Sequence, residues 1–391
     1  MRGWPSKIAV GLSLAVVVAS AGMAVFNKTA TSAIPRSKAL QGAVTSKHGD
    51  TNILLLGLDS RRDNNGADLP RALLDLMHVG SSSSIGGYNT NTMIVIHIPA
   101  NGTGATAISI PRDDYVNVPG LGMKKIKEAY GYAKYAEDSR LYKLGVKEPD
   151  RERLSREAGR KATIATITAL LGIPIDHFAE VNLVGFYDIA KALGGIQVCL
   201  NHAVNDSQYS GAVFPAGVQT ISGVDALKFV RQRHGLPNGD LDRTHRQQAF
   251  ITGVITKFRS QGIFGDLGKL QSLLTVAKKD VVIDSGWDVL GFLPQAKALT
   301  GGHIVFHTLP IEGYVMRNLQ SVNLIDVAKV RKFTHDLFFP APKIAKPTAS
   351  SSASGATTTA KATPKPKPTK INYANQANGK AVNGGTIPCV N

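Results

Sequence analysis

Hydrophobic and polar positions follow two alternating patterns between residues 50 and 340. Short apolar runs bounded by turn residues are typical of buried strands, whereas longer amphipathic stretches are typical of helices. The runs predict strands at 52–59, 92–98, 105–110, 196–200, 280–284 and 303–309. The amphipathic stretches predict helices at 155–171, 183–193, 222–230, 243–260 and 323–337. Strands that alternate with helices predict an α/β domain, a layered α-β-α fold around a central mixed β-sheet.

The pattern stops at both ends of this domain. Residues 8–26 form an uncharged apolar run, long enough for one N-terminal transmembrane helix, and Arg2 and Lys7 precede it. Beyond residue 340 the chain is rich in Pro, Ala, Ser, Thr and Lys, which is typical of an extended spacer. The predicted organisation is a cytoplasmic stub and signal-anchor helix at 1–26, a linker at 27–49, the folded domain at 50–340 and a low-complexity basic tail at 341–391.

The N-terminal run also bears on location and partners. We expect an uncleaved signal anchor in the cell membrane, with the domain on the extracytoplasmic side. The small residues at 19–24 resemble a signal-peptidase site, so cleavage and secretion remain the alternative. In both cases the domain is exported. The formal net charge of +17 then indicates an anionic membrane surface or an anionic wall polymer as partner, and argues against nucleic acid.

Motifs of several common enzyme classes are missing from the sequence. It contains no HExxH, CxxC, G-x-S-x-G or Walker A motif, so the protease, esterase and NTPase interpretations lack support. The histidines stand singly, without the spacing of metal ligands. The two cysteines, Cys199 and Cys389, can form one disulfide in an exported protein, or can be a buried thiol and an unrelated tail thiol.

Polar residues lie at the predicted ends of three strands. Asp59 follows the first strand, Asn91 precedes the second and Arg112 follows the third. Ligands of open α/β sheets lie outside the carboxyl ends of the strands, so Asp59 and Arg112 are candidates for one shared site. Each of these residues alone is also compatible with a turn or a surface ion pair.

A segment with four arginines and no lysine, RQRHGLPNGDLDRTHRQQ, occupies residues 231–248. If the preceding helix ends near residue 230 and the chain then extends, Arg231 and Arg233 share one face. Arginine presents a planar fork of donors that matches phosphate geometry, which a lysine does not. The choice of arginine therefore indicates an anion that is held in a fixed geometry.

The second half of this segment begins the next predicted helix. Asp240 or Asp242 is expected to cap it, and Arg243 and Gln247 lie one turn apart on the same side. The N-terminus of a helix is itself an anion site, because its free N–H groups and its dipole favour negative charge. Three arginines and a glutamine can therefore converge there, an arrangement that predicts a pyrophosphate site.

These segments, in this order, resemble the LytR–CpsA–Psr family of cell-wall glycopolymer ligases. The matching blocks run from about residue 52 to 258, with weaker matching to 339, and include SIPRD and R-x-R followed by D-x-x-R-x-x-R-Q. The resemblance implies transfer of a glycan phosphate from a polyprenyl-pyrophosphate-linked glycan donor to a peptidoglycan acceptor, usually the 6-hydroxyl of N-acetylmuramic acid. Polyprenyl phosphate is released.

The resemblance also implies a role for each candidate residue. Those expected to hold the pyrophosphate are Arg112, Arg231, Arg233, Arg243 and Gln247. Asp240 is expected to orient the arginines or to act as a base, and Asp59 and Asn91 to ligate Mg²⁺ or Mn²⁺. The family usually has aspartate in place of Asn91, so the ion should be held more weakly here. A prenyl tail requires an apolar pocket, and the predicted helix 155–171 is a candidate for lining it.

Two other interpretations remain open. In the same site, water can replace the sugar hydroxyl, which would make the protein a phosphatase of polyprenyl pyrophosphate. Alternatively, the protein is a non-catalytic wall- or lipid-binding protein that keeps the arginines, with a metal site weakened by Asn91.

Overall fold

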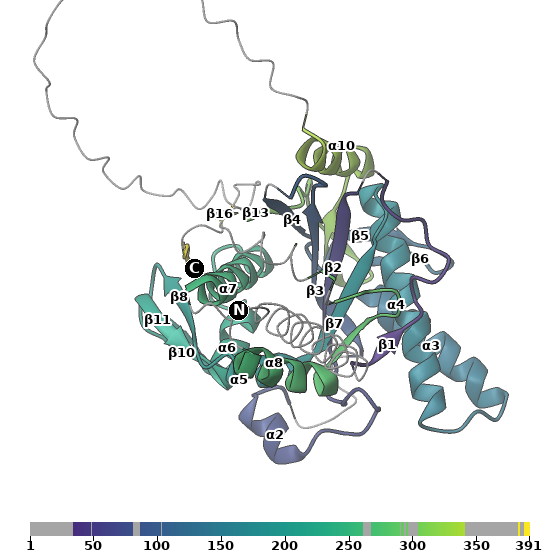
Figure 1. The fold of residues 1–391 in the computed structure, drawn as a ribbon, viewed down its shortest axis with the longest axis horizontal. Helices are drawn as coiled ribbons and strands as arrows, with labels where there is room; N and C mark the ends of the chain where they lie inside the picture. The colour runs from purple at the N-terminus through teal and green to yellow at the C-terminus, as the bar shows by residue number, and fades with distance from the viewer. Residues whose placement is uncertain are drawn as a thin grey trace, which may run out of the picture.

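The computed structural model describes residues 34–47, 49–80, 87–102, 104–260, 267–289, 291–292, 295, 304–340, 382–383 and 387–391. It confirms the predicted α/β fold, since a large mixed sheet lies between two groups of helices (Figure 1). Within these residues no helix is long and apolar enough to cross a membrane. The predicted span 8–26 lies outside them.

The central sheet has eight strands in the described part of the chain, in the order β1-β12-β7-β2-β3-β4-β13-β16. Strand β2 runs parallel to β7 and antiparallel to β3, and β4 runs antiparallel to β3. The C-terminal ends of β2, β4 and β7 and the N-terminal end of β3 therefore meet at one edge. The strands are β1 (Arg36–Ser37), β2 (Thr51–Asp59), β3 (Asn89–Ile98), β4 (Ala105–Ser109), β7 (His177–Asn182), β12 (Val281–Asp284), β13 (Ile304–Thr308) and β16 (Val382–Asn383).

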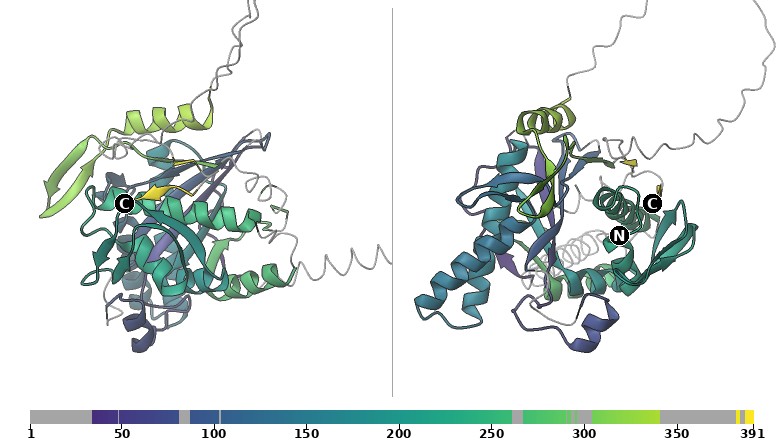
Figure 2. Two further views of the ribbon diagram at one scale, coloured as in Figure 1. Left: turned by 90° about the vertical axis from the view of Figure 1, so that its left-hand side faces the viewer. Right: turned by 180° about the vertical axis from the view of Figure 1, so that it is seen from behind.

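Helices cover both faces of this sheet (Figures 1 and 2). Alternate residues of β2 supply both cores: Leu54 and Leu56 pack with α4 and α10, whereas Ile53 and Leu55 pack with α7 and α8. The helices of the first face are α3 (Glu128–Lys143), α4 (Asp150–Leu171) and α10 (Val327–Phe338). Those of the second face are α5 (Leu183–Ala192), α6 (Gly223–Arg231), α7 (Asp240–Ser260) and α8 (Leu267–Asp280), and a short helix α2 (Arg71–Leu76) packs against α5 and α6.

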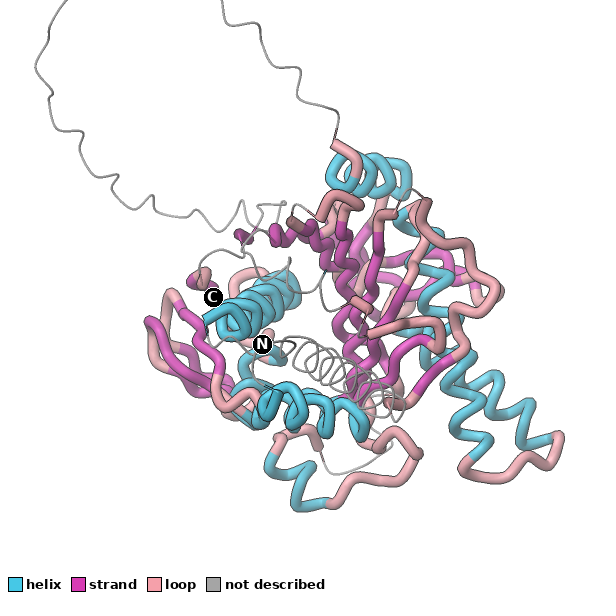
Figure 3. The backbone as a smooth tube through the Cα atoms, viewed as in Figure 1, coloured by secondary structure: helices cyan, strands magenta, loops and turns pink. Residues whose placement is uncertain are grey.

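Small sheets complete the domain, and Figure 3 shows α7 between one of them and the central sheet. Ile196, Val198 and Leu200 of β8 pack with Ala249 and Phe250 of α7. The strand predicted at 196–200 is thus confirmed, but it belongs to this small sheet. The remaining strands are β5 (Tyr115–Val118), β6 (Gly122–Lys125), β8 (Ile196–Leu200), β9 (Val204–Asp206), β10 (Ala212–Phe214), β11 (Gly217–Ile221), β14 (Gly313–Arg317), β15 (Gln320–Leu324) and β17 (Cys389–Val390).

The structure corrects some of the predicted helices. The predicted helix 323–337 is wrong at its start, because residues up to Leu324 form β15 and the helix begins only after Asp326. The Asp326 carboxylate accepts hydrogen bonds from the N–H groups of Ala328 and Lys329, which fixes this start. Helix α3 was not predicted, because exposed aromatic residues such as Tyr135 interrupt its apolar pattern.

Cys199 and Cys389 form a disulfide, so the interpretation as two unrelated thiols is wrong. The bond lies where β17 pairs in parallel with β8, and Val390 enters the core beside α7. Residues 382–383 add the edge strand β16 to the central sheet. These described residues of the region predicted as a tail therefore contact the folded domain, while the predicted boundary near residue 340 stays a prediction.

Candidate functional site

Asp59 and Arg112 meet at one edge of the central sheet, as their positions predicted. Asp59 is the last residue of β2, and Arg112 follows the end of β4, which runs in the same direction. The predicted place of Asn91 is wrong, because it lies within β3 rather than before it. Since β2 and β3 are antiparallel, Asn91 still lies beside Asp59, and its Nδ2 donates to Asp59 Oδ2 at 2.8 Å.

A β-bulge turns the Asn91 side chain toward this edge. The register pairs Gly57 with Thr92 and Leu58 with Thr90, so Asn91 is the extra residue of β3. In a regular strand, adjacent residues point to opposite faces of the sheet, but here Asn91 and Thr92 line the same cavity. A Cβ atom at Gly57 would lie 2.8 Å from the Cβ of Thr92, so the close approach at the bulge requires glycine.

Arg231 and Arg233 lie where the chain leaves α6. This helix ends at Arg231, and Gln232 has an extended conformation with ψ of 133°. The predicted early end is confirmed to within one residue, and both arginines line the same cavity. Arg231 Nη1 donates to the carbonyl oxygens of Met77 and His78 at 3.2 Å each, which fixes its direction.

Helix α7 brings Arg243 and Gln247 to the cavity, one turn apart. The helix begins at Asp240, three residues before the predicted start. Asp240 Oδ1 lies 3.0 Å from Arg112 Nε and 2.8 Å from Arg243 Nη2. Asp240 therefore joins two arginines that come from different elements, and it does not itself line the cavity.

The cavity has a volume of about 470 Å³ and lies between the sheet and helices α5, α6 and α7. One part of its wall is polar and consists of Asp59, Asn91, Thr92, Arg112, Asn182, Arg231, Arg233, Arg243 and Gln247. The other part is apolar and includes Leu55, Ile94, Phe186, Ile189, Leu227, Val230, Phe250 and Ile251. The prediction that helix 155–171 lines the apolar pocket is wrong, because α4 packs on the opposite face of the sheet.

Positive charge exceeds negative charge in the polar wall. Burial and the nearby charges of Arg112 and Arg233 lower the pKa of Arg243 to about 10, although Asp240 acts in the opposite direction. Burial likewise lowers the pKa of Arg231. Arg243 Nε has no hydrogen-bond partner among the residues that the structure describes. Since an added anion would stabilise these cations, the arrangement fits a ligand with an anionic head and an apolar body.

A family model with the description LytR_cpsA_psr family matches residues 15–337. The chain belongs to this family. It is similar to the cell wall biosynthesis protein LcpA of Corynebacterium glutamicum, with 42% identity over 73% of this chain and 55% of that protein, so it spans about half of that relative's length.

Two further comparisons agree with this family. The chain is 27% identical to a polyisoprenyl-teichoic acid–peptidoglycan teichoic acid transferase, TagU, of Bacillus licheniformis, over 72% of this chain and 75% of that protein. The solved structure of TagT bound to LI-WTA has 21% identity and a TM-score of 0.53, and the match covers 77% of this chain and 97% of that one. The latter likeness supports the LytR–CpsA–Psr fold.

The two residues expected to ligate a metal lie together, but only Asp59 fits that role as the side chains stand. Asn91 presents its Nδ2 to Asp59, while its Oδ1 accepts from Arg112 Nη1 at 2.8 Å. The other oxygen of Asp59 accepts from Arg61. Asp59 thus offers one carboxylate at the cavity wall, and Mg²⁺ commonly uses only one or two carboxylates together with water and phosphate oxygens.

Sequence reasoning missed several charged residues beside the site. Arg61 pairs with Asp59 and donates to the carbonyl oxygen of Val79 at 3.0 Å. Asp113 pairs with Lys125 at 3.0 Å and Lys127 at 2.7 Å. Burial alone would raise the pKa of Asp113, but the charges of Arg112 and Lys127 lower it to about 2. Arg61 lies within GLDSRR, Asp113 within IPRDD, and Lys125 and Lys127 within KIKEAY. The closeness of Arg61 to Asp59 and of Asp113 to Arg112 along the chain is the signal that could have found these two.

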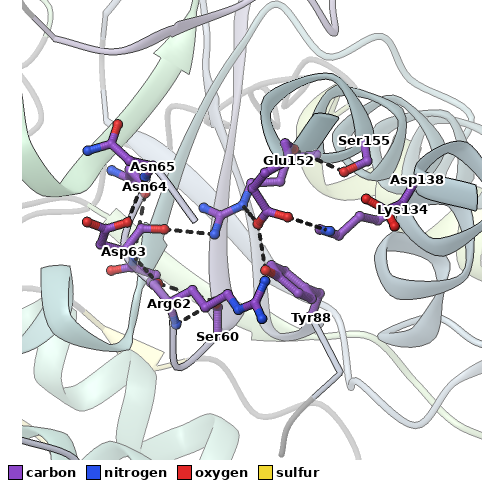
Figure 4. Close-up of polar contacts among 12 residues, drawn as sticks. Ser60, Arg62, Asp63, Asn64, Asn65, Tyr88, Lys134, Asp138, Glu152 and Ser155 are labelled. Atoms are coloured by element: carbon purple, nitrogen blue, oxygen red, sulfur yellow. Dashed lines mark hydrogen bonds and ion pairs between the residues drawn. The ribbon is translucent and has the colours of Figure 1, made fainter. Parts of the chain in front are cut away.

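A buried ionic network on the opposite face of the sheet supports the loop after β2, and Figure 4 shows Tyr88 and Lys134 converging on Glu152. Tyr88 donates to Glu152 at 2.5 Å, and Lys134 Nζ lies 2.7 Å from the same carboxylate. Arg156 pairs with Glu152 at 2.7 Å and donates to the carbonyl oxygen of Asp63 at 2.8 Å. This network therefore fixes the chain just beyond Asp59 against α4.

Proposed function

We propose that this protein transfers a glycan phosphate from a polyprenyl-pyrophosphate-linked donor to a peptidoglycan hydroxyl, and so attaches a glycopolymer to the cell wall. The observation that carries the proposal is the cavity, because four arginines belong to the polar part of its wall while the other part is apolar. A prenyl pyrophosphate has the same two parts. The names of the relatives, a cell wall biosynthesis protein and a teichoic acid–peptidoglycan transferase, support this substrate class.

The arginines would hold the pyrophosphate, and the apolar wall would hold the prenyl chain. The residues Arg112, Arg231, Arg233 and Arg243 come from three different segments and line one cavity. Phosphoryl transfer requires in-line positioning of the two oxygens and neutralisation of charge on the non-bridging oxygens. Guanidinium groups supply both, and Arg112 and Arg243 are buried and already held by Asp240 before the substrate arrives.

In the transfer, the acceptor oxygen forms a bond to the glycan-bearing phosphorus, and the bond from that phosphorus to the bridging oxygen of the lipid phosphate breaks. The proton of the acceptor hydroxyl is released to solvent, and polyprenyl phosphate leaves with the bridging oxygen. We assign an orienting role to Asp240 rather than the role of base. Both of its oxygens are buried, and Oδ1 holds Arg112 and Arg243 in position.

Mg²⁺ or Mn²⁺ belongs to the proposal as a cofactor, with Asp59 as its protein ligand. When bound, the ion would neutralise part of the phosphate charge. Asn91 would contribute only if its amide oxygen turned from Arg112 toward Asp59, since the present contacts direct it to the arginine. The ion is therefore expected to bind mainly together with the pyrophosphate.

The location follows from the same substrates. We propose that residues 8–26 anchor the chain in the cell membrane, with the domain on the extracytoplasmic side, where both the lipid-linked donor and peptidoglycan are present. Seven lysines and no acidic residue follow residue 336, and the basic C-terminal region would contact an anionic wall polymer.

The test is product analysis with the full chain, a lipid-linked glycan donor and peptidoglycan. The proposal expects glycan joined to peptidoglycan through a phosphodiester, together with polyprenyl phosphate. Release of glycan phosphate to water alone would identify a phosphatase instead. Absence of any turnover, with donor binding retained, would identify a non-catalytic binding protein. The matched control is Arg259→Lys, at the exposed far end of α7, which should transfer at the wild-type rate.

A further inference from the structure

A second pocket, of about 620 Å³, adjoins the first, and Arg231 lines both. Its wall also includes Arg71, Asp75, His78, Gln208 and Tyr209. Most of this wall is polar, in contrast to the first cavity, whose wall is largely apolar. The ligand that fits it is therefore a polar one, and it would lie next to an arginine that we assign to the pyrophosphate.

Two arginines fix one wall of this pocket: Arg61, which pairs with Asp59, and Arg231, which lines the first cavity. Arg231 donates to the carbonyl oxygens of Met77 and His78, and Arg61 donates to that of Val79 through both Nε and Nη2, at 3.0 and 2.9 Å. Met77 and Val79 are themselves buried. The loop after α2 is thus fixed directly to the residues of the first cavity.

The same pocket is also lined by an aromatic ring that is exposed to solvent. Tyr209 is 59% exposed, and its ring stacks on His234 with ring centroids 3.9 Å apart. Its loop, between β9 and β10, is organised by the buried carboxylate of Asp206, which accepts from the hydroxyl and the N–H of Ser210. The N–H groups of Tyr209 and Gly211 donate to the Asp206 carbonyl oxygen. The stacking on His234 therefore leaves a large part of the Tyr209 side chain open to solvent on a loop that is fixed in place.

We propose that this second pocket is a saccharide subsite, an inference that rests on the proposed function and specifies where the sugar next to the reacting phosphate lies. A sugar ring has an apolar face of C–H groups, which would stack on Tyr209, and hydroxyl groups, which would hydrogen-bond to His78, Gln208 and the Arg71–Asp75 pair. Because Arg231 borders both pockets, a sugar held there adjoins the pyrophosphate.

Two sources could supply this sugar: the glycan of the donor, or the acceptor glycan of peptidoglycan. The experiment therefore has two binding arms with the full chain. One uses a soluble N-acetylglucosamine–N-acetylmuramic acid disaccharide, and the other a soluble glycan phosphate without lipid. Calorimetric titration of Tyr209→Ala, Tyr209→Phe and wild type gives the dissociation constants. Tyr135→Ala, which removes a tyrosine that is 73% exposed on α3, is the matched control.

The subsite predicts that Tyr209→Ala weakens binding in one arm by about tenfold, while Tyr209→Phe and Tyr135→Ala stay within about threefold of wild type. The arm that changes identifies the source of the sugar. Unchanged dissociation constants in both arms, or the absence of saccharide binding by wild type, overturn the inference. Failure of the proposed function is separate: saccharide binding that depends on Tyr209, without any transfer to peptidoglycan, refutes the transferase and leaves the subsite standing.

Discussion

Buried arginines lie on both faces of the central sheet, and their surroundings are opposite. Behind the sheet, Arg160 makes two hydrogen bonds of 2.9 Å to Glu180, and Arg156 pairs with Glu152. Although burial acts in the opposite direction, the negative charge of Glu180 raises the pKa of Arg160. At the cavity, burial and neighbouring arginines instead lower the pKa of Arg243 to about 10.

The difference is one of charge balance. On the α4 side, each arginine has its own carboxylate, so the cluster is complete without a ligand. On the cavity side, Arg112 and Arg243 share Asp240, and the hydrogen bonds of Arg231 are to carbonyl oxygens. The first cluster therefore stabilises the fold, whereas the second keeps an excess of positive charge that an anion can neutralise.

The largest expected effect is on stability and comes from the cluster behind the sheet. Arg160→Gln leaves the buried carboxylate of Glu180 without its partner, so the free energy of unfolding should fall by about 3–5 kcal/mol. Denaturant unfolding measures this change. The double variant Arg160→Gln/Glu180→Gln should recover part of the loss, because no unpaired charge remains. A loss below about 1 kcal/mol for the single variant would contradict the structural role.

The next prediction concerns the stability of the fold at acidic pH. Burial would raise the pKa of Glu152, but Arg156 and the hydrogen bonds from Lys134 and Tyr88 lower it from 4.5 to about 2. Because the pKa of Glu152 is lower in the folded state than in the unfolded state, ionised Glu152 stabilises the fold at a pH above the unfolded-state value. This stabilisation should disappear as the pH falls from about 4.5 to 2. The shift corresponds to roughly 3 kcal/mol.

Urea unfolding at several pH values tests this expectation, with Glu152→Gln as the comparison. The variant should be less stable than wild type at pH 7 and should lose less stability between pH 4.5 and 2. Asp113 has a pKa of about 2 and contributes in the same window in both proteins, so the difference between the two curves isolates Glu152. Parallel curves would show that Glu152 is not stabilised as an anion.

The cavity arginines should affect activity instead. Arg231→Lys and Arg243→Lys keep the positive charge but lose the planar fork, and a charge-assisted hydrogen bond contributes about 1.5–3 kcal/mol. Each variant should therefore lose about tenfold or more in transfer rate, and melting curves separate this loss from any loss of stability. The measurement is transfer from a lipid-linked donor. Wild-type rates in both variants would instead indicate a solvated basic surface.

Arg246 would be an unsuitable control for this series. It lies on α7 outside the Arg243–Gln247 side, but it is fully buried, donates to the carbonyl oxygen of Asn391 and lies 5.0 Å from the Phe229 ring centroid. Arg246→Lys should therefore affect stability. Arg259 is exposed on the same helix, so Arg259→Lys provides the matched comparison.

Local features of the sequence predicted most of the site, and long-range contacts account for what they missed. The end of α6, which lets Arg231 and Arg233 share the cavity, follows from Gly235 and Pro237 a few residues later. The burial of Arg246 depends on Asn391, 145 residues away, which no local pattern reports.

The face of the sheet that holds the cavity was likewise not predictable. Strand β2 is apolar on both faces, so its pattern does not distinguish the side of α4 from the side of α7. The bulge at Asn91 depends on the pairing of β3 with Gly57 of β2. The glycine inside an apolar strand was the only local sign of this bulge in the sequence.

The smallest expected effect concerns Asn91, where the wall of the cavity has an amide in place of a carboxylate. Asn91→Asp removes the hydrogen bond to Asp59 and places two carboxylates together. Without metal, their repulsion should lower the melting temperature slightly. With Mg²⁺ between them the melting temperature should recover, and Mg²⁺ should bind several-fold more tightly than in wild type because a second charged ligand is present.

Calorimetric titration with Mg²⁺ and with Mn²⁺, and melting curves with and without each ion, measure both effects independently of turnover. Asn117→Asp, on the exposed side of β5, adds the same charge away from the cavity and should bind the ions as wild type does. If Asn91→Asp matches this control, Asn91 is not a ligand, and its amide serves only to connect Asp59 with Arg112. Tighter binding in Asn91→Asp alone would instead place the ion between β2 and β3, beside Arg112.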